Sequence, residues 1–260
     1  SLLNISCTGI CAQNELSDLS RLDKNAIIKA YQKYPDFIVG LKARMSKSVL
    51  GDSGNQPLVF AKEMQKQVHL PLMVHIGTAP SLLEDVVNML DAKDMITHIF
   101  NPKDNGILKN HQIKDCVYQA KKKGILLDLG HGSDSFSFDV ASKAFEQGIE
   151  VNTISSDIYF RNRLNGPVYS LVTTMNKMLY VGYSLDKVIN CVTHNAAKAL
   201  NLLNLGDIEV GKIADFTVFK VVDQDVKLVD SMKHEVISHQ QIIPTHTIVK
   251  NEIYTIGEEK

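Results

Sequence analysis

Short apolar runs alternate with longer amphipathic segments along most of the chain. The apolar runs have the length of strands and carry hydrophobic residues almost throughout, which is typical of strands covered on both faces. The expected strands are residues 2–6, 37–42, 72–76, 95–99, 125–129 and 152–156. From the second strand onward their starts are spaced by 35, 23, 30 and 27 residues, enough for a strand and a helix. The pattern predicts a parallel α/β architecture, either an open sheet or a closed barrel.

Residues that start and stop helices separate these strands. Starts are expected at Asp23 before 24–34, Ser81 before 82–90 (a capping box with Glu84), Pro167 before 168–181 and Ser184 before 185–203. Left-handed glycines are expected to end three helices: Gly124 after 113–123, Gly148 after 139–147 and Gly182 after 168–181. No G-x-G-x-x-G follows a strand, so a dinucleotide-binding open sheet loses its main support.

The pattern changes after residue 206. Short β-rich runs broken by turn residues follow at 213–222, 226–229, 235–237 and 247–256. We therefore expect residues 1–206 to form a catalytic α/β domain and residues 207–260 to form part of a small β-sandwich.

Composition narrows the class of protein. The 260 residues carry 28 Lys and Arg against 29 Asp and Glu, and 44% are hydrophobic, as in ordinary soluble globular proteins. The near-neutral charge disfavours a nucleic-acid partner, and no stretch has the roughly 20 apolar residues of a membrane helix. Four scattered cysteines favour free thiols and a cytoplasmic location. The chain opens at Ser1 directly in an apolar run, as if entering a strand already inside a domain.

Chemically competent side chains follow successive expected strands. Strand ends carry Lys42, His75, His98, Asp128 with His131, and Asp157. Because function gathers at the carboxyl ends of parallel strands, we expect these groups to lie together. Imidazole and carboxylate suit zinc, and a buried lysine that loses its proton can react with carbon dioxide to give an anionic carbamate ligand. Taken singly, each histidine could be a core residue and Lys42 a surface one, but the ordered set favours metal ligands.

The same residues lie in motifs that resemble a known family. GLKARMS, PLMVHIG, ITHIFNP, LDLGHGSDSFSF, SSDIY, NGPVYSL and GDIEVGKIADFTVF together resemble the amidohydrolase superfamily, in its dihydroorotase-like branch of amidohydrolase/deacetylase metallohydrolases. The resemblance implies a TIM-type (β/α)8 barrel with a small C-terminal β appendage.

The resemblance also implies roles for individual residues. Lys42 is similar to a carboxylated lysine that bridges two zinc ions, and His75 and His98 are similar to ligands of one of them. Asp157 is similar to the catalytic aspartate that binds the other metal and accepts the proton of the attacking water. Substrate-side positions are Asn101 and His131 by resemblance, and Arg44 because a guanidinium can grip a carboxylate. A salt bridge for Arg44 and a loop-capping role for His131 are the alternatives.

One departure from the family concerns the first strand. The superfamily carries a His-x-His pair there, and this sequence contains none. With Lys42 on the fourth barrel strand, residues 2–6 become the third, so the barrel is expected to lack its first two strands and two metal ligands. A complementing N-terminal segment or a homo-oligomer is the partner that this expectation suggests.

Three functions are compatible with the sequence. The favoured one is metal-dependent hydrolysis of an amide, cyclic amide or ester of a small molecule by metal-activated water. The first alternative is an adenine or purine deaminase of the same superfamily. The second is a catalytically inactive, truncated or split-gene fragment.

Overall fold

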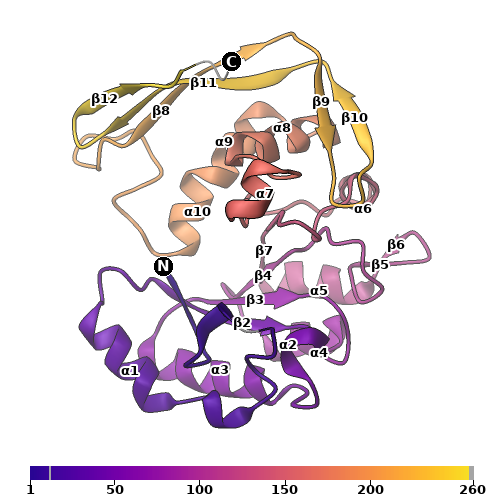
Figure 1. The fold of residues 1–260 in the computed structure, drawn as a ribbon, viewed down its shortest axis with the longest axis vertical. Helices are drawn as coiled ribbons and strands as arrows, with labels where there is room; N and C mark the ends of the chain where they lie inside the picture. The colour runs from indigo at the N-terminus through magenta and orange to yellow at the C-terminus, as the bar shows by residue number, and fades with distance from the viewer. Residues whose placement is uncertain (12, 258–260) are drawn as a thin grey trace.

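A parallel sheet forms the centre of the molecule. The computed structural model describes residues 1–11 and 13–257, and its main sheet has the order β1–β2–β3–β4–β7 with every neighbouring pair parallel (Figure 1). The strands are β1 (Leu2–Asn4), β2 (Gly40–Met45), β3 (Leu72–Ile76), β4 (Met95–Thr97) and β7 (Leu126–Leu127). The parallel direction of every neighbouring pair confirms the predicted parallel α/β class. Strand β2 begins later than expected because Phe37 and Ile38 donate their backbone hydrogen bonds to Tyr34 in a turn.

Helices follow the strands and cover the sheet. They are α1 (Lys24–Lys33), α2 (Lys47–Leu50), α3 (Gln56–Val68), α4 (Leu83–Met89), α5 (Asp115–Lys123), α6 (Phe138–Glu146), α7 (Phe160–Leu164), α8 (Leu171–Val181), α9 (Leu185–Val192) and α10 (His194–Ala199). Two 3₁₀ turns, Gly9–Cys11 and Leu19–Arg21, and a small hairpin of β5 (Leu108–Lys109) and β6 (Gln112–Ile113) complete this part. No helix of the described residues is both long and apolar enough to cross a membrane.

The two faces of the sheet differ in burial. Leu41 and Ala43 of β2 are fully buried, whereas Lys42 and Arg44, which alternate with them along the strand, lie on a partly open face. On β3 the same alternation leaves His75 on the partly open face. The expectation that these strands are covered on both faces is therefore wrong for β2 and β3. Because side chains alternate along a strand, this register gathers polar groups on one side.

Several helix boundaries follow the predicted signals. Asp23 caps α1 by accepting hydrogen bonds from the backbone N–H groups of Asn25 and Ala26. Gly124 (φ 79°) and Gly182 (φ 115°) end α5 and α8 in the left-handed conformation, as glycine does without a Cβ clash.

Other predicted boundaries are wrong. Ser81 does not cap α4, because Leu82 occupies the N-cap position and the backbone N–H of Leu83 donates to Asn105 Oδ1 at 3.0 Å. Pro167 follows a cis peptide bond rather than starting a helix, and α8 begins after Ser170, whose hydroxyl caps it. The single helix expected over 185–203 is divided into α9 and α10 at Thr193, whose hydroxyl donates to the Ile189 carbonyl.

A small β region follows the last helix. Its strands are β8 (Phe216–Val222), β9 (Val226–Val229), β10 (Glu235–Ser238), β11 (Gln241–Val249) and β12 (Glu252–Thr255). Strands β12, β11 and β8 form one antiparallel sheet, at the opposite end of the molecule from α1 and α3 (Figure 1), and β9 and β10 form a hairpin. The run 247–256, expected as one strand, turns back at Lys250 and Asn251, which have φ angles of 52° and 65°. Left-handed residues at both centres are typical of a tight hairpin turn.

The segment expected as the last parallel strand is held by backbone hydrogen bonds to residues 127–132 and by side chains that bond to Asp128. Residues 152–156 form only an isolated parallel bridge, between Asp128 and Thr153. The fully buried Asp128 carboxylate accepts hydrogen bonds from the hydroxyls of Thr97 (2.6 Å), Thr153 (2.7 Å) and Ser155 (2.7 Å). These bonds join β4, the end of β7 and residues 153–155.

Replacing this carboxylate tests its contribution to the fold. Asp128→Ala is expected to lower the free energy of unfolding by about 3 kcal/mol, because three hydroxyls lose their acceptor in a buried site. Denaturant unfolding measures the change. The exposed Asp139, paired with Lys143 on α6, provides a control, and Asp139→Ala should change the stability by less than about 0.5 kcal/mol. Equal losses for both variants would contradict the structural role of Asp128.

Candidate metal centre

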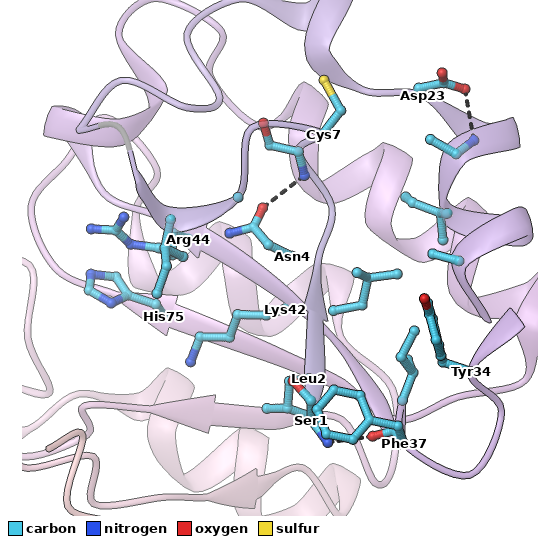
Figure 2. Close-up of a pocket in the computed structure, with 18 of the residues that line it drawn as sticks. Ser1, Leu2, Asn4, Cys7, Asp23, Tyr34, Phe37, Lys42, Arg44 and His75 are labelled. Carbon is cyan, nitrogen blue, oxygen red and sulfur yellow. Dashed lines mark hydrogen bonds between the residues drawn. The ribbon is translucent and has the colours of Figure 1, made fainter. Parts of the chain in front are cut away.

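Side chains from neighbouring strands meet at one pocket. Lys42 and Arg44 share a face of β2, and Arg44 is the register partner of His75 on β3. Figure 2 shows these three side chains grouped at one side of the pocket. The cavity measures about 1270 Å³, and its lining also includes His98 and Asp157. The structure therefore brings all four sequence-predicted metal ligands to one cavity.

The two histidines are in direct contact. The ring centroids of His75 and His98 lie 4.4 Å apart, with the planes at 75°. His98 has a left-handed backbone (φ 66°), and its carbonyl accepts hydrogen bonds from the Asn101 backbone and side chain. Its Nδ1–H donates to the Gly130 carbonyl at 2.5 Å. This bond fixes the ring and leaves Nε2 available as a metal ligand.

The surroundings keep both imidazoles neutral. Burial, supported by the Lys42 charge, lowers the pKa of His98 to about 3. Burial followed by the charges of His98 and Lys42 holds the pKa of His75 well below its usual value. The neutral ring is the form that binds a metal ion.

The other two groups are also perturbed by burial. Burial lowers the pKa of Lys42 to about 8, against the opposing charges of Asp128 and Asp157. Burial raises the pKa of Asp157, against the attraction of Lys42 and Arg44. Asp157 has a left-handed backbone (φ 47°), which is costly for a residue with a Cβ and occurs more often at functional sites.

The donor chemistry fits a zinc-type ion, although the protein ligands are few. Among residues 1–11 and 13–257, no group of three or more His, Cys, Asp and Glu side chains is close enough together to hold a metal ion. Two neutral imidazoles are suitable zinc ligands, and a carbamate on Lys42 would add the anionic oxygen that such a set needs.

Arg44 is held by a buried carboxylate that the sequence did not single out. Glu15, fully buried, accepts from Arg44 Nη1 at 2.8 Å and from Asn4 Nδ2 at 2.8 Å. Arg44 therefore forms a salt bridge and also lines the pocket. Glu15 lies in a loop and belongs to no recognisable sequence motif, so only the structure reveals its contact with Arg44.

Asn101 and His131 lie beside the pocket rather than on its lining. Asn101 is buried and holds the His98 carbonyl. His131 is fully buried, and its Nδ1–H donates to the Gly132 carbonyl at 2.7 Å. Its Nε2 accepts from Lys177 Nζ at 2.7 Å. Both side chains thus support loops next to the site.

Lys177 is a second residue that sequence analysis missed. It is fully buried on α8, between Met175 and Met178. Burial lowers its pKa to about 7, against the opposing charge of Asp230. Its position on the apolar face of an amphipathic helix is the sequence signal that could have identified this lysine as buried.

Comparison with known proteins identifies the family. The profile of the Amidohydrolase family matches residues 61–252, most of the chain. The chain belongs to the Amidohydrolase family. This amidohydrolase has the fold of a TIM-type barrel and contains part of the strands of that barrel. Its family and its relatives indicate a hydrolase that acts on carbon–nitrogen bonds.

Relatives and solved structures resemble this amidohydrolase over nearly its whole length. A protein named deacetylase from Enterococcus faecalis is 46% identical over 256 residues, which are 97% of this chain and 69% of the relative. A deacetylase from Brucella anthropi is 37% identical over 89% of this chain and 58% of its own. A crystal structure titled as an adenine deaminase has a TM-score of 0.97 at 46% identity, covering 98% of this chain and 70% of that one. A structure titled as a dihydroorotase has a TM-score of 0.90 at 35% identity, with the same coverage.

A glycine substitution tests how closely the His98 loop is packed. Gly130 has a φ of +53°, and a Cβ there would lie 2.1 Å from Thr97 Oγ1 and 2.9 Å from His98 Nδ1. Gly130→Ala is expected to lower the free energy of unfolding by more than about 2 kcal/mol, from backbone strain and overpacking together. Gly148 is the matched control, because its φ is +75° and nothing lies within 4 Å of its added Cβ. Gly148→Ala should cost about 1 kcal/mol, and an equal cost at both positions would contradict the packing.

The pH dependence of stability tests the burial of Lys177. The pKa of Lys177 is about 7 in the folded chain and 10.5 for a lysine in water, so the unfolded chain binds more protons between these pH values. The free energy of unfolding therefore rises with pH in this range, by at most about 1.4 kcal/mol per unit from this group. Lys177→Met removes that gain. Denaturant unfolding at several pH values above about 7 measures the two slopes, and equal slopes would contradict the lowered pKa.

Proposed function

We propose that this amidohydrolase hydrolyses an amide, cyclic amide or ester of a small molecule with the help of bound zinc. The observation that carries the proposal is the convergence of Lys42, His75, His98 and Asp157 on one cavity. Their types and their perturbed pKa values suit metal-assisted hydrolysis.

His75 and His98 would hold one zinc ion through neutral imidazoles, and a carboxylated Lys42 would bridge to a second ion held by Asp157. Zinc bound there would supply an acidified water and polarise the carbonyl of the substrate. The hydrogen bond from His98 Nδ1 to Gly130 supports this assignment because it leaves Nε2 without a proton in a residue that lines the cavity.

The chain's own residues would handle the proton and the substrate. The raised pKa of Asp157 suits a carboxylate that accepts a proton from water and returns it to the leaving nitrogen or oxygen. Arg44 would attract an anionic group of the substrate, since it lines the cavity and Glu15 fixes one of its nitrogens. Asn101 and His131 would influence substrate binding indirectly, by holding the loops whose backbone carbonyls they bond.

The names of the relatives favour deacetylation, and one structure favours a second candidate. Three relatives are named deacetylases, which supports removal of an acetyl group. The solved structure with a TM-score of 0.97 is titled as an adenine deaminase, so deamination of a purine is the second candidate.

The remaining features of the proposal concern partners, location and domains. We propose a cytoplasmic enzyme without a nucleic-acid or membrane partner, in keeping with the free thiols of Cys7, Cys116 and Cys191. Residues 1–206 would form its barrel and residues 207–260 part of a β-sandwich. A homo-oligomer or an N-terminal segment that supplies further metal ligands would complete the site.

Metal content and carbamate formation test the site directly. The purified chain, incubated with Zn²⁺ and ¹³C-bicarbonate, is expected to bind zinc and to show a carbamate carbon signal by NMR. Lys42→Met should abolish the signal and lower the bound zinc. Lys47 is exposed and lies two residues after the end of β2, so Lys47→Met should change neither the carbamate signal nor the amount of bound zinc. Absence of bound zinc, even with the part of the Enterococcus faecalis deacetylase that this chain does not match supplied, would overturn the proposal.

Substrate assays separate the two candidate reactions. Release of acetate from N-acetyl amino acids or acetyl esters is expected, and Asp157→Asn should reduce it at least about a hundredfold by removing the proton acceptor. Release of ammonia from adenine without acetate release would favour the deaminase. Activity that persists in Asp157→Asn would contradict the role of Asp157.

A further inference from the structure

Lys177 makes two hydrogen bonds inside the protein, and both acceptors are neutral. Its Nζ donates to His131 Nε2 at 2.7 Å and to the Pro167 carbonyl at 2.7 Å. The amine also lies 5.8 Å from the centre of the Phe136 ring, which stacks on His131. Burying a lysine costs several kcal/mol when no carboxylate is bonded to it. A fold that retains such a lysine uses its donors for a specific geometry.

The first acceptor connects Lys177 to the turn beside Asp157. Because the Gly132 carbonyl can only accept, the proton of the neutral His131 ring is on Nδ1, and His131 Nε2 accepts from Lys177. That proton is donated to the Gly132 carbonyl at 2.7 Å. A Cβ on Gly132, at φ +53°, would lie 2.8 Å from Asp157 Oδ2, so the turn packs directly against the carboxylate. The orientation of the Gly132 peptide thus limits where the carboxylate can lie.

The second acceptor connects Lys177 to the loop that follows Asp157. The Asp157 carbonyl accepts from Asn162 Nδ2 at 3.1 Å, and the Asn162 carbonyl accepts from the backbone N–H of Tyr169 at 3.0 Å. Pro167 lies within this bonded loop, and its carbonyl is fixed by Lys177. Asp157 therefore lies between two segments that bond to the same ammonium group.

We propose that Lys177 is a positioning residue for Asp157, acting through His131 and Gly132 on one side and through the Pro167 carbonyl on the other. The left-handed backbone of Asp157 supports this, because a strained residue keeps its conformation only when the surrounding contacts enforce it. The importance of this positioning for hydrolysis rests on the proposed function.

The ring protons of histidine provide the first test. In the unsubstituted chain, ¹⁵N NMR of labelled histidine is expected to show His131 with its proton on Nδ1, and His131→Gln assigns the signal. Lys177→Met and the milder Lys177→Gln should shift the His131 ring signals and the backbone amide signals of Gly132 and Asp157. A His131 proton on Nε2 in the unsubstituted chain would overturn the proposal. This measurement does not depend on whether a variant folds.

A matched control is another lysine that bonds a histidine. Lys143 Nζ lies 2.9 Å from His111 Nδ1 at the surface. Lys143→Met should leave the signals of His131, Gly132 and Asp157 unchanged. Equal changes in both lysine variants would show a general loss of structure rather than a specific link.

Zinc affinity then tests the functional part. Competition with a chelator is expected to show binding about tenfold weaker in Lys177→Met, the size typical of residues that support metal ligands, and unchanged binding in Lys143→Met. If Lys177→Met leaves the Asp157 amide signal unchanged, the proposal is overturned. If the unsubstituted chain binds no zinc, the proposed function fails instead, and the NMR comparison in the metal-free chain still decides the link between Lys177 and Asp157.

Discussion

The Asp128 carboxylate is the point at which the sheet and the candidate site are joined. Its oxygens accept three hydroxyl hydrogen bonds, from Thr97 on β4 and from Thr153 and Ser155 in the segment before Asp157. Thr97 immediately precedes His98, so both ends of the site depend on this group. A buried carboxylate is stable only with such bonds, because an unpaired charge in the interior costs several kcal/mol. The same bonds that stabilise Asp128 therefore connect the strand that precedes His98 with the segment that precedes Asp157.

Local backbone conformation completes the arrangement. His98 and Asp157 are both left-handed, and the nearby Gly130 and Gly132 have φ angles of +53°. At Gly130 a Cβ would meet Thr97 and His98, and at Gly132 it would meet the carboxylate of Asp157. The glycine backbone therefore packs closely against the side chains of His98 and Asp157. The site is thus shaped before any metal or substrate binds.

Burial and mutual repulsion explain the protonation states around the pocket. Lys42 and Arg44 lie beside two histidines, and their charges add to burial in keeping the imidazoles neutral. Burial raises the pKa of Asp157 while Lys42 opposes that rise. The lowered pKa values of the imidazoles and the raised pKa of the carboxylate have one main cause in common, which is burial.

The sequence by itself determined the parallel α/β class and the identity of the residues at the strand ends. These follow from local patterns: the spacing of apolar runs, the cap at Asp23 and the glycines at 124 and 182. The motifs that contain these residues, from Lys42 to Asp157, also resemble the family when taken in order. Only the tertiary structure decided that Glu15 holds Arg44, that Asn101 and His131 support loops, and that Lys177 is buried beside His131. Such contacts join residues far apart in the chain, and no local pattern records which distant side chain will meet a donor once it is buried.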